Sequence, residues 1–237
     1  MKINIKSLTE QHSSWLASNP VIGCPMNCAY CFLKPKGLNG IKPKILFTPK
    51  EALDNLTSSV FYRKDIPVAT GTRTDYFATP ENINYLKKYL IEYNKRKITN
   101  PLVIITKKKI PDDVINLLVK LQNKGSTFII FLSYSGLDAS IEQGIDPIEL
   151  KNNFIRLKKA NLNIIHYWRP FIPQNSTKKI MTSVLEHVVK YAKASVVTGL
   201  RLTPEMQKQF WFWEEAQNLD VDLSKWRVYG RIRHKNI

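Results

Sequence analysis

The chain alternates short apolar runs with longer segments of helical periodicity, and this alternation constrains the fold more than any other feature. Each run is rich in β-branched residues and is followed by a loop and then by apolar residues spaced three and four apart. Runs that are apolar throughout are typical of strands buried on both faces of a parallel sheet. The runs, which we expect to form six parallel strands, are residues 19–23, 66–71, 101–106, 127–133, 162–168 and 195–200.

The segments between these runs carry start signals of helices. "TPKE" (48–51) and "DPIE" (146–149) each place a capping residue before a proline and a glutamate at the third helical position. Six strand–helix units in one α/β domain can form a doubly wound open sheet or a partial barrel. The predicted helices span roughly 49–61, 80–97, 111–124, 147–160, 176–193 and 204–217.

Polar groups follow each predicted strand. In both folds ligands bind at the carboxyl ends of the strands, so these groups predict a site at one rim. The groups are the cysteine cluster after the first strand, then "TRTD" (72–75), "KKK" (107–109), "SYSGLD" (133–138), "RPFIP" (169–173) and "RL" (201–202).

All three cysteines of the chain, Cys24, Cys28 and Cys31, lie in "CPMNCAYC" with three and two residues between them. Three thiolates on one loop suit a four-iron cluster that keeps one iron free of protein ligands, whereas an electron-carrying cluster normally has four cysteines. A catalytic zinc with three ligands stays open as an alternative. Structural zinc needs a fourth ligand, and the four histidines lie far from the cluster in sequence.

Length and composition predict one cytoplasmic domain over residues 1–237, with a core over about 17–217 and a basic, aromatic tail over 218–237. No apolar run has the roughly 18 residues of a membrane span, and the N-terminus has no secretory leader pattern. The formal net charge is +17, which suits contact with nucleic acid but is also compatible with a solvated basic surface. The tail stretch "KWRVYGRIRHK" (225–235) has the same two interpretations.

The cysteine motif resembles the signature of the radical S-adenosylmethionine (SAM) superfamily. "GTRTDYFATPE" (71–81), "VIITKK" (103–108), "FLSYSGLD" (131–138), "FIP" (171–173) and "GLRLTPE" (199–205) follow in the order seen in its spore photoproduct lyase-like branch. The resemblance implies a partial (β/α)6 barrel of the TIM type, a [4Fe–4S] cluster on Cys24, Cys28 and Cys31, and SAM bound to the cluster. It also implies reductive cleavage of SAM, and hydrogen abstraction from a substrate by the 5′-deoxyadenosyl radical.

The same resemblance implies roles for single residues. Tyr30 would touch the adenine of SAM, Thr72 and Thr74 would lie near its methionyl end, and Lys107 and Ser133 would contact it. We further predict Tyr134 and Asp138 as catalytic residues. For substrate binding we predict an aromatic platform and a few polar groups, supplied by Asp75, Tyr76, Arg169 and Arg201.

The substrate expected for this branch is a modified nucleobase. Spore photoproduct lyase uses a further cysteine as a hydrogen donor, whereas this chain has none outside the cluster and stops soon after its sixth unit. These departures favour a small substrate, and the more specific hypothesis is a queuine lyase that releases a deazaguanine precursor. Repair or modification of DNA or RNA is the alternative. Either activity needs an external electron donor of the flavodoxin or ferredoxin type.

Overall fold

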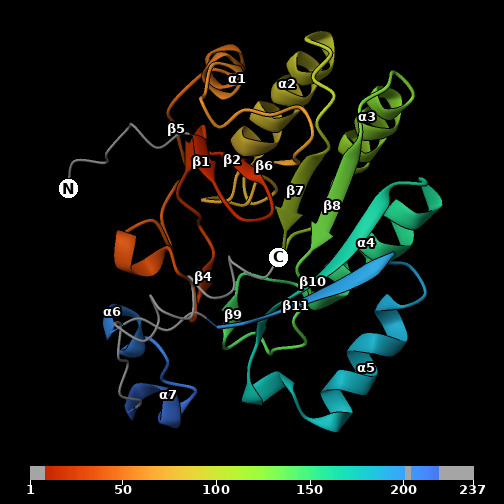
Figure 1. The fold of residues 1–237 in the computed structure, drawn as a ribbon. Coiled ribbons are helices and arrows are strands. Elements are labelled where there is room, and N and C mark those ends of the chain that lie inside the picture. The colour runs from red at the N-terminus through yellow and green to blue at the C-terminus, as the bar shows by residue number, and fades with distance from the viewer. Residues whose placement is uncertain (1–8, 201–203, 219–237) are drawn as a thin grey trace.

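The computed structural model describes residues 9–200 and 204–218, and a curved seven-stranded sheet organises them (Figure 1). The strand order is β1-β2-β6-β7-β8-β10-β11, with β1 (Thr9–Gln11) antiparallel to β2 and every other neighbouring pair parallel. The parallel strands are β2 (Leu16–Ser18), β6 (Val68–Thr70), β7 (Leu102–Thr106), β8 (Phe128–Leu132), β10 (Asn163–Phe171) and β11 (Ala194–Gly199). Six parallel strands in chain order confirm the predicted partial (β/α)6 barrel.

One predicted strand is wrong. Residues 19–23 do not enter the main sheet: β3 (Val21–Ile22) pairs instead with β5 (Lys44–Ile45) in a separate two-stranded sheet. The first parallel strand is Leu16–Ser18, whose three residues are buried. Pro20 lies between the two short apolar segments and cannot donate a backbone hydrogen bond to a sheet, so the chain leaves the barrel there.

Helices follow the strands along the outer side of the sheet (Figure 1). They are α1 (Pro49–Thr57), α2 (Pro80–Lys95), α3 (Asp112–Gln122), α4 (Pro147–Lys159) and α5 (Lys178–Val188). The predicted caps form: Thr48 and Glu51 make a reciprocal capping box, and Asp146 accepts hydrogen bonds from the amides of Ile148 and Glu149. The sixth predicted helix, 204–217, is two short helices, α6 (Pro204–Gln207) and α7 (Glu214–Asn218).

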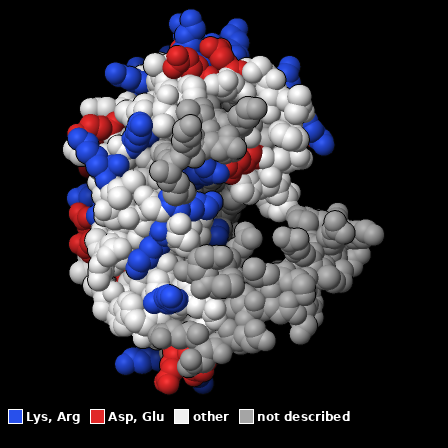
Figure 2. Space-filling model, turned by 90° about the vertical axis from the view of Figure 1, so that its left-hand side faces the viewer, with Lys and Arg blue, Asp and Glu red and all other residues white. Residues whose placement is uncertain are grey.

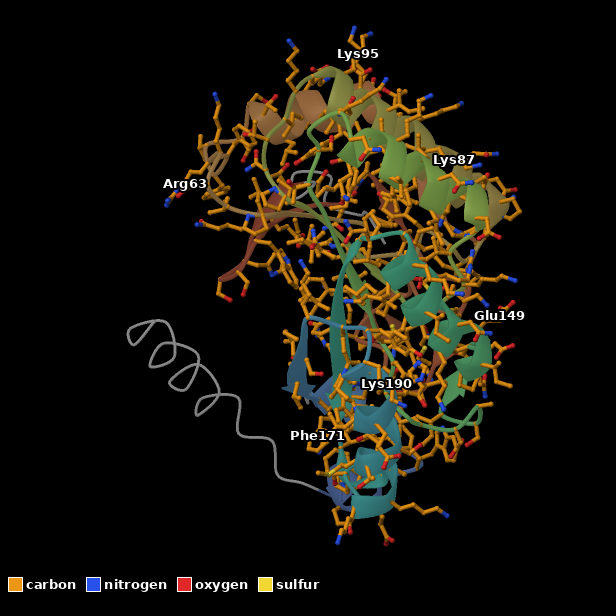
Figure 3. The ribbon with its side chains drawn as sticks, turned by 90° about the vertical axis from the view of Figure 1, so that its right-hand side faces the viewer. Arg63, Lys87, Lys95, Glu149, Phe171 and Lys190 are labelled. Atoms are coloured by element: carbon orange, nitrogen blue, oxygen red, sulfur yellow. The ribbon has the colours of Figure 1, made fainter. Side chains whose placement is uncertain are left out.

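The outer helices bury one face and expose the other. On α2, Tyr85, Tyr89 and Tyr93 recur every fourth residue, are at most 5% exposed and stack along the sheet side. Lys87, Lys95 and Glu149 project from the opposite side of their helices (Figure 3).

The cysteine loop is held at the carboxyl side of the sheet by short pairings. β4 (Asn27–Cys28) pairs with β9 (Glu142–Gln143), which comes from the loop after β8, and Cys24 bridges to Asn39. A short 3-10 helix, Lys34–Lys36, follows the loop and contacts α6. The predicted tail lies outside the described residues except for residue 218, and so does Arg201. Within the part of the chain that is described, no helix is long and apolar enough to cross a membrane.

Candidate functional site

A cavity of about 430 Å³ opens at the carboxyl ends of the parallel strands, and the three cysteines line it. Cys24 and Cys28 are 7% and 6% exposed, and Cys31 is partly buried. Much of the rest of the lining comes from residues at or just past the carboxyl ends of four different strands: Gly71, Thr72, Thr74, Lys107, Ser133 and Arg169. The parallel topology thus brings together residues that are more than a hundred positions apart in the sequence.

The thiols of the cysteine loop are strongly desolvated. Burial raises the pKa of Cys24 and of Cys28 to about 12, and nearby Lys107 opposes that rise at Cys28. A buried thiol favours its neutral form unless a metal displaces the proton. Three soft sulfur donors on one cavity wall therefore fit an iron–sulfur cluster. Among the described residues, no three His, Cys, Asp or Glu side chains converge on a single metal ion.

Lys107 is the centre of a buried polar network behind Cys28. Its Nζ lies 2.8 Å from Glu142 Oε1 and also donates to the carbonyl oxygens of Ser133 and Arg169, at 3.1 and 3.3 Å. An ammonium group has three donors, and these three bonds use all of them. The contact between Lys107 and SAM that the resemblance implies would have to replace one of these bonds.

Glu142 is one of the site residues that sequence reasoning missed. It is 5% exposed, accepts from the hydroxyl of Tyr30 as well as from Lys107, and faces Cys28 across the β4–β9 pairing. Burial and the neighbouring Glu142 carboxylate raise the pKa of Tyr30, so its hydroxyl stays protonated. The network fixes the tyrosine that precedes the last cysteine of the motif. No sequence signal marks Glu142, because it lies in an irregular loop far along the chain.

The predicted SAM-contacting residues all line the cavity. Tyr30, Thr72, Thr74, Lys107 and Ser133 are brought together there. The hydroxyl of Thr74 donates to the carbonyl of Gly23 at 2.6 Å, and that of Thr72 donates to Asn19 Oδ1 at 2.9 Å. These bonds tie the loop after β6 to the segment that leads into the cysteine motif. Their roles toward SAM stay predictions.

The predicted substrate-binding residues separate into two groups. Arg169 lines the cavity, where its Nη1 donates to the Tyr167 hydroxyl at 2.8 Å. Asp75 also lines it but is 5% exposed and accepts from Thr106 Oγ1 and from the amides of Phe77 and Lys107. Asp75 therefore braces the loops after β6 and β7. Arg201 is outside the described residues.

Three of the predicted residues are not at the cavity. Tyr76 is 1% exposed, bonds Thr70 and packs so tightly on Gly71 that a Cβ there would lie 2.3 Å from its ring. Tyr134 is 6% exposed and packs among Phe154, His166 and His187 in the core. Asp138 is exposed and accepts from Ser140 and the Ile141 amide in a local turn. These positions do not match a catalytic role for Tyr134 or Asp138, or a substrate platform on Tyr76.

A second group of residues in the cavity lining has a different composition. We call His12, Trp15, Phe32, Lys36 and Arg169 the mouth; all line the cavity, and Phe32 is 38% exposed. Lys36 Nζ and Arg169 Cζ each lie 5.8 Å from the centroid of the Phe32 ring. Among the described residues, the buried indole Nε1 of Trp15 has no hydrogen-bond partner. Sequence analysis identified one of these residues, Arg169.

Comparison with known proteins gives a match at the level of structure. No family model and no curated protein sequence matches the chain. A spore photoproduct lyase double mutant with bound AdoMet and dinucleoside spore photoproduct superposes with a TM-score of 0.68, at 12% identity, over 93% of this chain and 68% of that one. The chain has the fold of spore photoproduct lyase.

Two further structures agree with this likeness. Spore photoproduct lyase complexed with dinucleoside spore photoproduct gives a TM-score of 0.68 at 13% identity, over 93% of this chain and 68% of that chain. Methylornithine synthase gives 0.51 at 15% identity, over 78% of this chain and 52% of that chain. The sequence resemblance to the spore photoproduct lyase-like branch thus extends to the arrangement of the whole barrel.

Proposed function

We propose that the protein is a radical SAM enzyme whose three cysteines hold a [4Fe–4S] cluster and whose cavity binds SAM beside it. The observation that carries the proposal is the meeting of Cys24, Cys28 and Cys31 with the strand-end polar residues in one cavity. The spore photoproduct lyase structure that shares this fold contains AdoMet. The cysteine motif and the cavity that the distant strands form around it therefore both support a [4Fe–4S] cluster with SAM.

When bound, the cluster and SAM together would supply a radical able to remove hydrogen from a substrate carbon. The chain itself would bind and orient. Cys24, Cys28 and Cys31 would hold the cluster as thiolates, with their protons released to solvent on metal binding, and Lys107 favours the thiolate at Cys28. Tyr30, fixed by Glu142, offers an aromatic face next to the cluster loop. Burial of this wall excludes water from a reactive species.

A modified nucleobase is the proposed substrate, and cleavage of queuine to a deazaguanine precursor is the specific candidate. Flat heterocycles bind between aromatic side chains with a few directed polar groups, and Phe32, Trp15 and Tyr167 line the cavity with Arg169. The reaction would draw electrons from an external carrier of the flavodoxin or ferredoxin type.

A lyase acting on DNA or RNA is the second candidate, and one observation favours it. Lys and Arg atoms form a band across the middle of one face, while Asp and Glu atoms lie mostly toward its margins (Figure 2). The similar spore photoproduct lyase structure holds a dinucleoside. Basic surfaces of this kind attract phosphate backbones in a salt-dependent manner.

The test is anaerobic. The cluster is reconstituted, SAM and dithionite are added, and 5′-deoxyadenosine is quantified alone, with queuine and with oligonucleotides. The proposal predicts cleavage of SAM by the wild type and none by Cys28→Ala. Stimulation by queuine with a deazaguanine product supports the first substrate, and stimulation by an oligonucleotide supports the second. An iron-loaded wild-type protein that never cleaves SAM would overturn the proposed function.

A further inference from the structure

Two segments that are far apart in the sequence meet on the outer side of the cysteine loop. Cys31 is partly buried, whereas the other two cysteines are buried. Its carbonyl oxygen accepts from the Lys34 amide at 3.0 Å and from Gln209 Nε2 at 3.3 Å. The 3-10 helix Lys34–Lys36 also contacts α6, and in Figure 1 this short helix lies to the left of β4, with α6 below it. The cysteine nearest to solvent is therefore covered by a surface that these two segments form together.

This surface exposes aromatic rings. Among the described residues, three Phe, Tyr or Trp side chains are exposed, and two of them lie here. Phe32, directly after Cys31, is 38% exposed, and Trp211, two residues after Gln209, is 58% exposed. Exposed aromatic rings that gather on one surface are typical of protein–protein contacts.

The same two segments carry exposed lysines. Lys34 and Lys36 lie on the 3-10 helix, Lys208 directly precedes Gln209, and none of the three forms an ion pair with a described residue. Lys36 Nζ lies 5.8 Å from the centroid of the Phe32 ring. Figure 2 faces the side of the molecule on which the short helix and α6 lie, and Lys and Arg atoms form a band across its middle. We call Phe32, Lys34, Lys36, Lys208 and Trp211 the outer patch.

Most of the outer patch lies outside the cavity. Phe32 and Lys36 line the cavity, whereas Lys34, Lys208 and Trp211 do not. A small molecule bound in the cavity therefore leaves these three side chains to another partner. Aromatic rings among basic side chains suit a small, transient contact with an acidic protein, in which charge attraction speeds the encounter.

The proposed function requires such a partner, because the cluster must receive an electron from outside the chain. Electron transfer between proteins slows steeply with distance, so the carrier must dock close to the cluster. Cys31 is the proposed ligand nearest to solvent, and the outer patch surrounds it. This step rests on the proposed function.

We propose that the outer patch is the docking surface of the electron carrier, a small protein with an acidic surface around its redox centre. For a flavin carrier, the hydroquinone would give one electron to the oxidised cluster and become the semiquinone, and no covalent bond would form or break. The inference deepens the proposed function by assigning a surface and a charge type to its electron donor.

The test uses an acidic flavodoxin as the probe and the cluster-loaded protein with SAM. Formation of 5′-deoxyadenosine is measured with flavodoxin hydroquinone and, separately, with dithionite, a small reductant that needs no docking surface. Calorimetry with oxidised flavodoxin at two salt concentrations gives the affinity independently of catalysis. The proposal predicts binding that weakens as salt screens the lysines.

Lys34→Glu and Lys208→Glu should each weaken flavodoxin binding roughly fivefold or more, because each replaces attraction by repulsion. Trp211→Ala should weaken it roughly tenfold, as loss of an aromatic anchor does. The rate with dithionite should stay unchanged in all three variants. Lys190→Glu is the matched control, because Lys190 is an exposed lysine just after α5, on the opposite side of the molecule (Figures 1 and 3).

Four results would overturn the docking surface: no binding of flavodoxin by wild type, unchanged binding in Lys34→Glu and Lys208→Glu, an equal loss in Lys190→Glu, or an equal loss of rate with dithionite. An oligonucleotide that loses affinity for the variants while flavodoxin does not would assign the patch to nucleic acid and overturn it too. The proposed function has its own readout. Failure of a loaded wild type to cleave SAM with dithionite would overturn that function, whatever flavodoxin binding shows.

Discussion

The two sides of the cavity differ in how far their polar groups are satisfied. On the buried side, Lys107 uses all three of its donors, Asp75 accepts from three groups, and Glu142 bridges Lys107 and Tyr30. At the mouth, Arg169 and Lys36 have no carboxylate partner among the described residues, and the buried Nε1 of Trp15 has no hydrogen-bond partner among them. A saturated wall is preorganised to hold a cofactor in one place, whereas an unsaturated mouth has donors left for a substrate.

The largest expected effect is the loss of the cluster when one of the three cysteines on the buried side of the cavity is replaced. Each of Cys24→Ala, Cys28→Ala and Cys31→Ala removes one of three ligands, and the chain has no other cysteine to replace it. We expect loss of iron and loss of 5′-deoxyadenosine to the detection limit, measured by iron analysis and chromatography. Retention of a full cluster in any one variant would show that this cysteine is not a ligand.

The next effect concerns the buried ion pair. Glu142→Ala leaves Lys107, whose side chain is 13% exposed, without its carboxylate, and the free energy of unfolding should fall by about 3 kcal/mol. Glu149→Ala is the control, because its pair with Lys109 is exposed and should contribute less than about 1 kcal/mol (Figure 3). Urea unfolding of both variants measures the difference. Equal losses of free energy of unfolding in the two variants would mean that the Lys107–Glu142 pair does not stabilise the buried side of the cavity.

A smaller effect on stability is expected when two tryptophans, Trp168 and Trp15, are replaced and compared. Trp168 is 2% exposed and its Nε1 donates to the carbonyl of Ser135 at 2.9 Å, whereas the Nε1 of Trp15 has no described partner. Trp168→Phe should cost about 2 kcal/mol more than Trp15→Phe, because it loses both a hydrogen bond and buried contacts. Thermal unfolding of the two variants gives the comparison. A larger loss at Trp15 would contradict the absence of a hydrogen-bond partner at its Nε1 among the described residues.

The smallest expected effect is a pH dependence of the free energy of unfolding that arises at His166. Burial lowers the pKa of His166, whose ring nitrogens bond Ser195 Oγ and the carbonyl of Tyr134 at 2.9 and 2.8 Å. Below its ordinary pKa of about 6.5 the unfolded chain takes up a proton that the folded ring resists, so stability falls as the pH falls. Urea unfolding at pH 7.5 and 5.5 should show a larger loss in wild type than in His166→Gln. Equal losses of stability in the two proteins would exclude His166 as a source of the pH dependence.

Sequence reasoning predicted the residues whose position follows from a general rule. The cysteine spacing is local. Thr72, Thr74, Lys107 and Ser133 follow strand ends, and Arg169 lies near the carboxyl end of β10, all of which a parallel sheet must bring to one rim. Sequence reasoning was wrong for residues that lie further along the loops after the strands. Tyr76 and Tyr134 come just after strand ends, yet their rings turn into the core, and the direction of a loop is not encoded in periodicity.

Glu142 shows why the rest of the site could not be predicted. Its role depends on the pairing of β9 with β4, across residues 27–28 and 142–143, and neither segment has a strand pattern of its own. The first strand was misplaced for a related reason. Leu16–Ser18 and Val21–Ile22 are both short and apolar, and only the tertiary arrangement decides which of them enters the barrel.

The most direct test of the central claim is electron paramagnetic resonance of the anaerobically reconstituted, reduced protein with and without SAM. The account predicts about four irons per chain and a cluster spectrum that changes when SAM is added, because one iron has no protein ligand. Glu142→Gln should bind the cluster less homogeneously. A spectrum that SAM leaves unchanged in a fully loaded wild type would contradict the claim that the saturated wall holds a SAM-binding cluster.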